Sequence, residues 1–312
     1  LETVGCYIPG GRFPLPSTVF MTVLVAEVAG VQNLVVTTPP AEEGRPHPEI
    51  RAALSRIDNV DVYPIGGAQA IGAMAAGTGP VPAADLIAGP GNLYVTLAKK
   101  EVYGSVGIDL LAGPSEIAVI ATEEDSRADW VAADLLSQAE HDPRARSYCF
   151  SPQENFLRDV QSEVLRLLED HPNPDPVREA LSQSGLIRTD SVEEAVELSN
   201  ELAPEHLELH LPDAGRWARK CRNAGAIFVG AHTPEPIGDY VAGPSHTLPT
   251  QGSARFFSPL SVRTFMKSQS LIQTDSKTYD ERSRPGETVA AMENLWAHEK
   301  SLSIRRTNGD TQ

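Results

Sequence analysis

The fold is decided by VGCYI (Val4 to Ile8), NLVVTT (Asn33 to Thr38), VDVYPI (Val60 to Ile65) and DLIAG (Asp85 to Gly89). These four short apolar runs are separated by stretches with helical patterning, and each run ends in a Gly/Pro turn. Such alternation is typical of βαβ units, in which consecutive strands lie parallel in one sheet. The first third of the chain therefore predicts a parallel sheet covered by helices.

A second block of the same kind follows the AGPSE turn. Its apolar runs are IAVIA (Ile117 to Ala121), SYCF (Ser147 to Phe150), HLELHL (His206 to Leu211) and AGAIFVG (Ala224 to Gly230). After about Pro259 the strand signal fades, and one helical segment is predicted over Val289 to Ser303. We expect an α/β protein with two doubly wound Rossmann-like domains, residues 1–114 and 115–258, and a mostly helical C-terminal tail, residues 259–312.

Composition excludes several classes of partner. The 312 residues are 41% hydrophobic, which is enough for two cores, and 26 Lys+Arg stand against 42 Asp+Glu, a net charge of -16. That charge repels phosphate backbones and anionic lipid surfaces, so we expect no nucleic acid and no membrane as partners. Three cysteines without CxxC spacing suggest neither a disulfide framework nor a thiolate zinc site, and they favour a reducing, cytoplasmic compartment.

The chain opens on Leu1, and LETVGCYIPG already reads as a strand that runs into a loop. We therefore expect that a further N-terminal segment belongs to the natural protein.

SQAEHD (Ser137 to Asp142) closes an amphipathic helix and places Gln138 and His141 three positions apart. This spacing puts an amide and an imidazole on one face of a helix, where both can bind one metal ion. A surface polar cluster at a helix end is the alternative.

APEHLEL (Ala203 to Leu209) places Glu205 beside His206, just before an apolar strand. The preceding Pro204 favours a turn, from which both side chains can reach one cleft. A carboxylate and an imidazole together form a candidate proton-transfer site. The alternative is a solvated strand edge.

Two further segments carry candidate residues. IGDYVAGPSHTLPT (Ile237 to Thr250) holds Asp239 and His246 around a Gly/Pro loop, and ordinary turn chemistry explains it equally well. In AMENLWAHEK, Glu293 and His298 would lie roughly 140° apart on a regular helix and would not share a face.

The Gly-rich turns of the first block suit a ligand. GGAQAIG (Gly66 to Gly72) and GPGNLY (Gly89 to Tyr94) lead from strands into helices, where ligands of α/β sheets bind, and YIPGGRFPLPST (Tyr7 to Thr18) is a long loop of the same character. None spells GxGxxG or GxxxxGK[ST], so motifs alone assign no nucleotide.

Taken together, these segments resemble histidinol dehydrogenase. The matching blocks occur in one order over nearly the whole chain: YIPGGRFPLPS, GGAQAIGAMAAGT, GPGNLYVTLAKKEVYG, GIDLLAGPSE, WVAADLLSQAEHD, LAPEHLEL, GAIFVG, GDYVAGPSHTLPT, ARFFSPLSV and ENLWAH. The chain departs from the family pattern at Ser245, where many members have Asn, and in lacking the segment that precedes the YIPGG block in the family.

The resemblance implies an NAD-dependent, four-electron oxidation of L-histidinol to L-histidine through the aldehyde, the last step of histidine biosynthesis. It implies that His206 and Glu205 are catalytic, with His206 removing the hydroxyl proton and Glu205 helping to activate water. One zinc ion per subunit, which orients the substrate, would be held by Gln138, His141, Asp239 and His298. The substrate would contact these four residues, His206, and also Ser115, His246 and Glu293. NAD would contact Tyr7, Gln69 and Asn92.

The resemblance also assigns roles to the three regions. Residues 1–114 would contact NAD, 115–258 would carry the zinc and catalytic residues, and 259–312 would form the dimerisation tail. In the family this tail crosses to the partner subunit, which implies a homodimer with tail exchange. Three alternatives remain. The first is a dehydrogenase of the same superfamily that acts on another amino alcohol or polyol, and the second is a truncated non-catalytic module. The third is a zinc hydrolase built on Gln138, His141 and Glu205. Glu293 and His246 suit a cationic or imidazole-bearing substrate, which favours histidinol.

Overall fold

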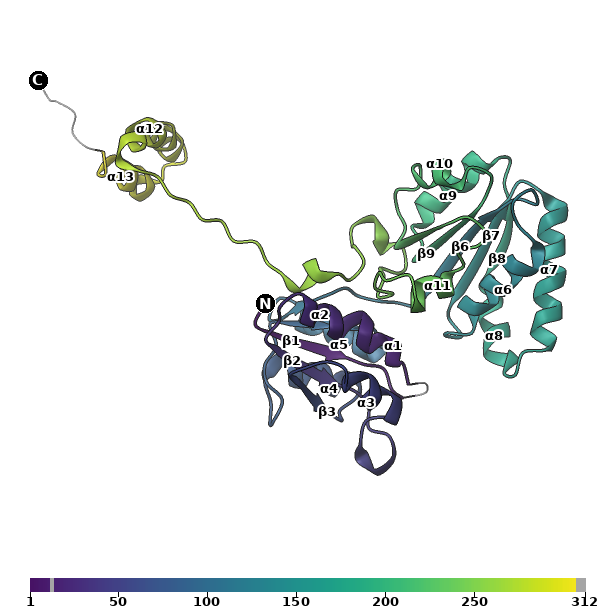
Figure 1. The fold of residues 1–312 in the computed structure, drawn as a ribbon. Helices are drawn as coiled ribbons and strands as arrows, with labels where there is room; N and C mark the ends of the chain where they lie inside the picture. The colour runs from purple at the N-terminus through teal and green to yellow at the C-terminus, as the bar shows by residue number, and fades with distance from the viewer. Residues whose placement is uncertain (12–13, 307–312) are drawn as a thin grey trace, which may run out of the picture. The chain divides into compact units, whose positions relative to one another are not determined.

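The computed structural model describes residues 1–11 and 14–306, so Arg12 and Phe13 of the predicted Tyr7 to Thr18 loop lie outside the described residues. The chain divides into two compact units, Leu1–Lys267 and Ser268–Gln312. The larger unit contains two parallel sheets (Figure 1). The predicted fold class, two α/β sheets followed by a helical C-terminal end, is confirmed.

The first sheet has five parallel strands in the order β3-β2-β1-β4-β5. The strands are β1 (Thr3–Tyr7), β2 (Asn33–Thr37), β3 (Val60–Tyr63), β4 (Leu86–Ala88) and β5 (Gly107–Ile108). Its helical segments are α1 (Pro16–Thr18), the π-helix η1 (Val19–Val23), α2 (Leu24–Val28), η2 (Glu42–Gly44), α3 (Pro48–Leu54), α4 (Gly67–Ala76) and α5 (Leu93–Val102). The four runs expected to be strands all form strands, whereas β5 was not predicted.

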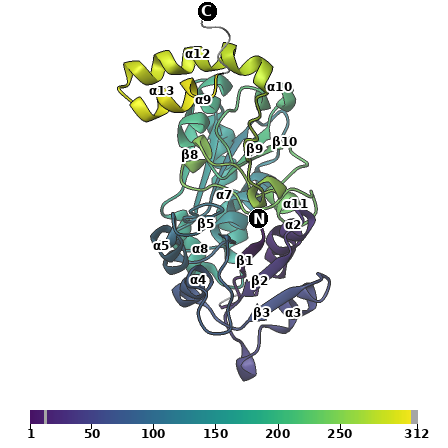
Figure 2. The same ribbon diagram turned by 90° about the vertical axis from the view of Figure 1, so that its left-hand side faces the viewer.

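Both faces of this sheet are covered, as its apolar runs require. Val4 and Cys6 of β1 pack into a core with η1 and α3, while Tyr7 packs on the other face with α4 and α5. Figures 1 and 2 show α2 and α3 on one side of the strands and α4 and α5 on the other. Alternate side chains of a strand point to opposite faces, so a strand apolar throughout serves two cores.

The second sheet is also parallel, in the order β10-β9-β6-β7-β8. Its strands are β6 (Glu116–Ala121), β7 (Arg146–Ser151), β8 (Gly185–Arg188), β9 (His206–His210) and β10 (Ala226–Val229). Its helices are α6 (Ala128–Ala139), α7 (Glu154–Glu169), α8 (Pro174–Leu181), α9 (Val192–Leu202), α10 (Ala214–Ala218) and α11 (Glu235–Tyr240). Leu207 and Leu209 of β9 pack on the core that includes α9. Alternation then directs His206, Glu208 and His210 to the opposite face, where α6 lies.

The main unit ends with a return to the first sheet. The segment contains two 3-10 turns, η3 (Ser253–Arg255) and η4 (Val262–Phe265). Leu260, between them, and Phe265, at the end of η4, are buried in the core beside β1. The main-chain oxygen of Phe265 also accepts a hydrogen bond from the N-terminal amine of Leu1, at 3.0 Å. The main unit therefore extends to Lys267, while the functional roles expected for 1–114, 115–258 and 259–312 stay predictions.

The second unit is a pair of helices, α12 (Ser276–Met292) and α13 (Trp296–Ser303), with Pro285 inside α12. Tyr279 Oη donates to the oxygen of Leu302 at 3.1 Å, which joins the two helices. The single helix predicted over Val289 to Ser303 is wrong, because the chain turns at Asn294, whose φ is 57°. The second unit leaves large apolar side chains exposed: the exposed fractions of Met292 and Trp296 are 78% and 73%.

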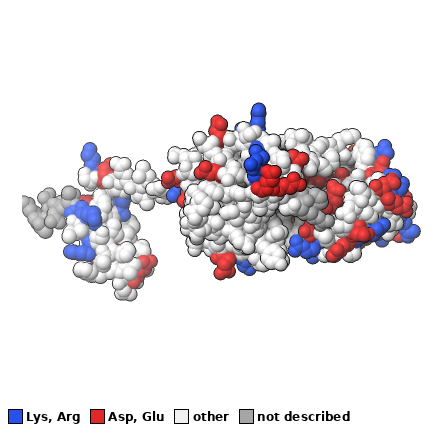
Figure 3. Space-filling model, turned by 90° about the horizontal axis from the view of Figure 1, so that it is seen from below, with Lys and Arg blue, Asp and Glu red and all other residues white. Residues whose placement is uncertain are grey.

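Within the described residues, no helix combines the length and the apolar character needed to span a bilayer. On the face shown in Figure 3, acidic and basic side chains are interspersed on the larger unit.

Candidate active site

The candidate site is built at the amino ends of β6 and β9, which pair directly with Ile117 opposite His206. Helix α9 ends at Leu202. The next residue, Ala203, turns the chain with a left-handed φ of 50°, and Pro204 follows. Glu205 and His206 then begin β9, while Ser115 immediately precedes β6. The turn thus presents both side chains at one end of the sheet.

Glu205 is buried. Its exposed fraction is 7%, so the solvated strand edge considered for it is wrong. The Ser115 hydroxyl donates a hydrogen bond to Oε2 of Glu205. Burial raises the pKa of Glu205 well above its usual range, the Ser115 hydrogen bond lowers it, and the nearby Glu116 and Asp239 carboxylates raise it further. A carboxyl with a raised pKa is a better base once ionised.

His206 is buried against Phe228, with ring centroids 6.0 Å apart. Its Nδ1 lies 3.0 Å from Oε1 of Gln138, and its Nε2 has no hydrogen-bond partner. An amide oxygen only accepts, so Nδ1 carries the proton in this arrangement and Nε2 keeps a free lone pair. Burial, with smaller effects of His141 and His246, lowers the pKa of His206 to about 3. The imidazole is therefore neutral, with Nε2 as its basic atom.

The predicted metal ligands of the main unit lie around this pair. Gln138 is fully buried, so it does not belong to a surface polar cluster, and its Nε2 has no partner. His141, one turn further on, is more open, with its side chain 46% exposed. Ligand atoms of His141, Asp239 and Glu235 all lie within 4.8 Å of one another. His246 Nδ1 is 3.8 Å from Asp239 Oδ1, which joins the predicted substrate residue to the same group.

These donors fit a zinc ion. Imidazole and carboxylate are ordinary zinc ligands, and the amide oxygen of Gln138 has a second lone pair beyond the one that faces His206. The buried Glu235 Oε1 has no hydrogen-bond partner, as expected of an oxygen near a cation. The structure brings Gln138, His141 and Asp239 together with Glu205, His206, Ser115 and His246.

Glu235 was not singled out from the sequence. It is 1% exposed at the start of α11, with Oε1 4.0 Å from His141 Nε2, and Ser137 Oγ donates to Oε2 at 3.3 Å. Burial first, and Asp239 second, raise its pKa to about 8. A single Glu in PEPIGD carries no sequence signal for such a position, because only the packing of α11 buries it.

A second buried cluster, Asp134, Glu208 and His210, lies further along β9 and α6. His210 Nε2 is 3.2 Å from Glu208 Oε2 and 4.0 Å from Asp134 Oδ2, and His210 Nδ1 is 3.0 Å from Ser126 Oγ. The other oxygen of Glu208 accepts from the Glu235 amide at 2.6 Å. The three side chains lie close together, and Glu208 connects the helix that begins at Glu235 to the strand of His206.

The predicted NAD-contacting residues lie on the first sheet. Tyr7 ends β1, and its Oη accepts from the Gly67 amide at 3.1 Å, at the start of α4, which also carries Gln69. Asn92 caps α5 by accepting from the Tyr94 and Val95 amides at 3.0 and 3.2 Å. All three residues therefore stand at strand ends or helix starts, where ligands of such sheets bind.

A buried ion pair supports the turn before Asn92. The ammonium of Lys99 contacts Asp109 Oδ1 and donates to the oxygen of Gly89 at 3.1 Å, while the Gly89 amide donates to Asp109 Oδ2 at 2.8 Å. Both main-chain groups of Gly89 are thus held by one pair of side chains.

Glu293 and His298 belong to the second unit, at the end of α12 and in α13. Their predicted roles toward substrate and metal stay predictions.

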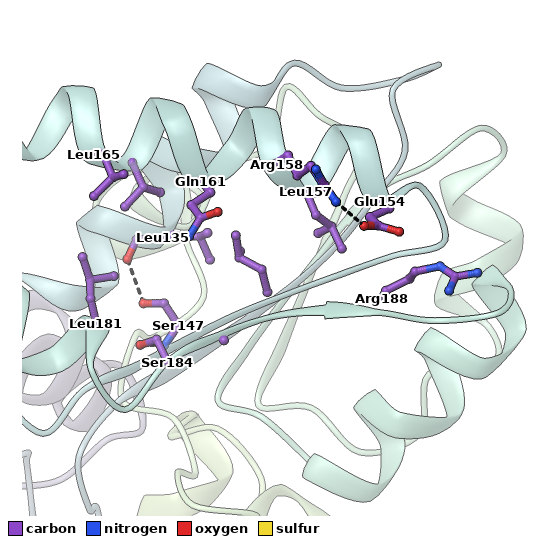
Figure 4. Close-up of a pocket in the computed structure, with 13 residues that line it drawn as sticks. Leu135, Ser147, Glu154, Leu157, Arg158, Gln161, Leu165, Leu181, Ser184 and Arg188 are labelled. Carbon is purple, nitrogen blue, oxygen red and sulfur yellow. Dashed lines mark hydrogen bonds and ion pairs between the residues drawn. The ribbon is translucent and has the colours of Figure 1, made fainter.

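One groove of about 590 Å³ lies elsewhere, along α7, α8 and β8. Figure 4 shows it lined by leucines, with the Arg158–Glu154 ion pair at one end. It contains none of the predicted site residues.

Comparison with known proteins decides the family. The model of the family described as "Histidinol dehydrogenase" matches residues 1–306. The chain belongs to the histidinol dehydrogenase family. It is 49% identical over 311 residues to the histidinol dehydrogenase of a Synechococcus strain and 48% identical over 307 residues to that of a Bacillus cereus strain. The alignments cover 99% and 98% of this chain and 71% of each relative.

The solved structures agree. The histidinol dehydrogenase from Elizabethkingia anophelis superposes with a TM-score of 0.93 at 40% identity, over 97% of this chain and 70% of that one. An acetylating aldehyde dehydrogenase from Geobacillus thermoglucosidasius gives a TM-score of 0.55 at 14% identity, over 88% of this chain and 76% of that one, a likeness of fold alone. The fold is thus shared beyond histidinol dehydrogenases, whereas the high sequence identities are to members of that family.

Proposed function

We propose that the chain catalyses the NAD-dependent, four-electron oxidation of L-histidinol to L-histidine through the aldehyde, the last step of histidine biosynthesis in the cytoplasm. The observation that carries the proposal is the free Nε2 of a buried, neutral His206 beside a buried Glu205. An imidazole base and a carboxylate base in one buried site suit two successive oxidations at one carbon, because each oxidation requires the removal of a proton.

Zinc would be held by Gln138, His141 and Asp239, with His298 as the fourth ligand. When bound, the ion orients the amino alcohol and polarises its oxygen, and neutral nitrogen and oxygen ligands leave room for substrate groups. The positions of Gln138, His141 and Asp239 in the main unit support their assignment as ligands. The assignment of His298 rests on the family resemblance.

In the first oxidation, His206 removes the hydroxyl proton of histidinol at Nε2. NAD, when bound, would accept the hydride of the adjacent C–H bond, which would leave the carbon as an aldehyde. The hydrogen bond from Nδ1 to Gln138 holds the ring so that Nε2 faces the substrate and not the amide. The low pKa of His206 keeps it unprotonated at the start of each turnover.

In the second oxidation, Glu205 takes a proton from the water that adds to the aldehyde carbon. A second NAD would accept the hydride of the hydrated aldehyde, and with loss of its hydroxyl protons to solvent the product would be the carboxylate. Ser115 orients Glu205 through the hydrogen bond to Oε2. Holding the aldehyde in the buried site until it is oxidised limits its escape.

The substrate would contact Ser115, His246 and Glu293. The carboxylate of Glu293 would interact with a cationic or imidazole group of the substrate. Tyr7, Gln69 and Asn92 would bind NAD at the ligand-binding end of the first sheet. Under this proposal residues 1–114 contact NAD and residues 115–258 carry the chemistry.

We also propose that residues 259–312 act as the dimerisation tail and that the enzyme is a homodimer with tail exchange, so that Glu293 and His298 complete the partner's site. The well-exposed Met292 and Trp296 support a surface that is covered in the assembled enzyme.

The test is NADH formation from NAD and L-histidinol by the purified chain, with and without a metal chelator. About two NADH per histidinol, lost on chelation and restored by zinc, is expected. One NADH per substrate, or full activity after verified removal of metal, would contradict the proposal.

A further inference from the structure

Glu116 is the first residue of β6, directly after Ser115, and its exposed fraction is 4%. Its Oε1 accepts two main-chain hydrogen bonds, from the amide of Glu205 at 3.1 Å and from the amide of Gln251 at 2.8 Å. One buried carboxylate oxygen therefore ties the chain at Glu205 to the segment at Gln251.

The peptide of Glu205 is held on both sides. Its N–H donates to Glu116, and its C=O accepts from the Ala226 amide at 2.8 Å on β10. The neighbouring Gly225 approaches so closely that a Cβ there would lie 2.6 Å from the Glu205 oxygen. With the side chain bound by Ser115, Glu205 is fixed at three points.

The main chain needs this support. Two residues before Glu205, Ala203 adopts a left-handed φ of 50°, which an L side chain rarely adopts and which costs free energy. Such a conformation persists only when the surrounding contacts impose it. Glu116 supplies one of the nearest of those contacts, because its buried carboxylate accepts the hydrogen bond that the Glu205 amide donates, and such bonds are strong in a buried setting.

We propose that Glu116 is a positioning residue that holds the Glu205 main chain, so that the Glu205 carboxylate meets Ser115 and the water added to the aldehyde. This inference rests on the proposed function. Glu116 does not touch the substrate; it acts through Glu205.

The charge of Glu116 also affects the pKa of Glu205. Burial raises the pKa of Glu116 to about 7, against the lowering effect of the two amide hydrogen bonds. The ionised Glu116 in turn raises the pKa of Glu205. Glu116→Gln keeps an oxygen that can accept the two N–H groups but removes the charge, whereas Glu116→Leu removes both.

The experiment compares these two variants with the wild-type chain, using L-histidinol and L-histidinaldehyde as separate substrates. For Glu116→Leu, kcat with the aldehyde is expected to fall about 10- to 100-fold with KM little changed, because Glu205 is misplaced. The zinc content should stay that of the wild type. Glu116→Gln should recover most of kcat, with the acidic limb of its pH profile moved to lower pH, because the pKa of Glu205 falls without the neighbouring charge.

Thr250→Val is the matched control. The Thr250 hydroxyl accepts from the Gly113 amide at 2.6 Å beside the same segment, without touching Glu205. We expect it to lower Tm and leave the pH profile in place.

Several outcomes decide the matter. Wild-type kinetics and pH profile in both Glu116 variants overturn the inference alone. If Glu116→Leu does not fold, Glu116→Ala removes the same two hydrogen bonds, and a wild-type kcat with the aldehyde in that variant has the same force. A wild-type chain that oxidises neither substrate would overturn the proposed function together with the inference built on it.

Discussion

His206 and Gln138 are hydrogen bonded, with Nδ1 of the imidazole 3.0 Å from Oε1 of the amide. The two residues are 68 positions apart in sequence, one at the start of β9 and the other in the last turn of α6. The contact joins the proposed base to a proposed metal ligand, so each fixes the orientation of the other. Within this pair of described side chains, the remaining nitrogens, Nε2 of His206 and Nε2 of Gln138, have no hydrogen-bond partner.

Replacement of His206 by Ala separates proton transfer from metal binding. We expect turnover to fall by about 100- to 10,000-fold, the usual contribution of a general base, while zinc stays bound because the four proposed ligands remain. Steady-state NADH formation and metal analysis of the same preparation measure both. His232→Ala, which removes an imidazole that packs at a tilt against Trp130 with ring centroids 5.1 Å apart, is the control. Loss of zinc from the His206 variant would count against the assigned role.

Gly89→Ala tests the turn that leads to Asn92. Gly89 has a φ of 114°, and a Cβ there would overlap the main-chain oxygen of Tyr7. Backbone strain and overlap together should lower the free energy of unfolding by about 3 kcal/mol. Gly79→Ala is a matched comparison, because its φ is 62° but open space surrounds it, and it should cost about 1 kcal/mol. Equal losses in urea unfolding would show that the close approach to Tyr7 is unimportant.

Much of the fold could be predicted because the strands are apolar runs bounded by turns. Where that signal is short or absent, prediction failed. β5 has two residues, too few to show any periodicity. Helix α12 was missed because its sequence is polar and contains Pro285, and the helix expected over Val289 to Ser303 is interrupted at Asn294.

The site shows a different limit. HLELH alternates polar and apolar residues, which ordinarily indicates a strand with one solvated face. The polar face is instead packed on α6, so His206, Glu208 and His210 are all buried. Sequence spacing could suggest the pair Gln138 and His141, but it could not find Glu116 or Glu235. Lone carboxylates acquire their roles only when distant segments pack around them.

Lys99→Met tests the buried ion pair under the Gly89 turn. The Lys99 and Asp109 side chains are 3% and 1% exposed, so removing the cation leaves a buried carboxylate that keeps only its main-chain donors. The free energy of unfolding should fall by about 3–5 kcal/mol. In the double variant Lys99→Met with Asp109→Leu, the loss should be smaller than the sum of the single losses. Strict additivity in denaturant unfolding would contradict the pairing.

Glu208→Gln should change how stability depends on pH. Burial raises the pKa of Glu208 from 4.5 to about 7, so ionisation is harder in the folded chain than in the unfolded one. The stability that its protonated form contributes is complete below pH 4.5 and is lost as pH rises through 7. Glutamine does not titrate, so the variant should gain about 3 kcal/mol relative to wild type between pH 4.5 and 7 and then level off.

Glu154→Gln is the comparison, because the pKa of Glu154 is shifted in the direction opposite to that of Glu208. The pKa of the exposed Glu154 is lowered, chiefly by its hydrogen bond with Arg158, so any stability it contributes appears above its unfolded pKa and is lost in acid. Urea unfolding at several pH values measures both variants. A Glu208→Gln curve parallel to the wild type would contradict a raised pKa.

Mixing two inactive variants tests tail exchange. His206→Ala damages the main unit and His298→Ala damages the second unit, so each homodimer should be inactive if His298 completes the partner's site. When the two chains are unfolded together and refolded in equal amounts, half of the dimers are mixed. In each mixed dimer one site combines an intact main unit with an intact tail, which predicts recovery of about a quarter of wild-type activity. If each tail served its own subunit, every site would still carry one lesion and no activity would return, so NADH formation after co-refolding distinguishes the two arrangements.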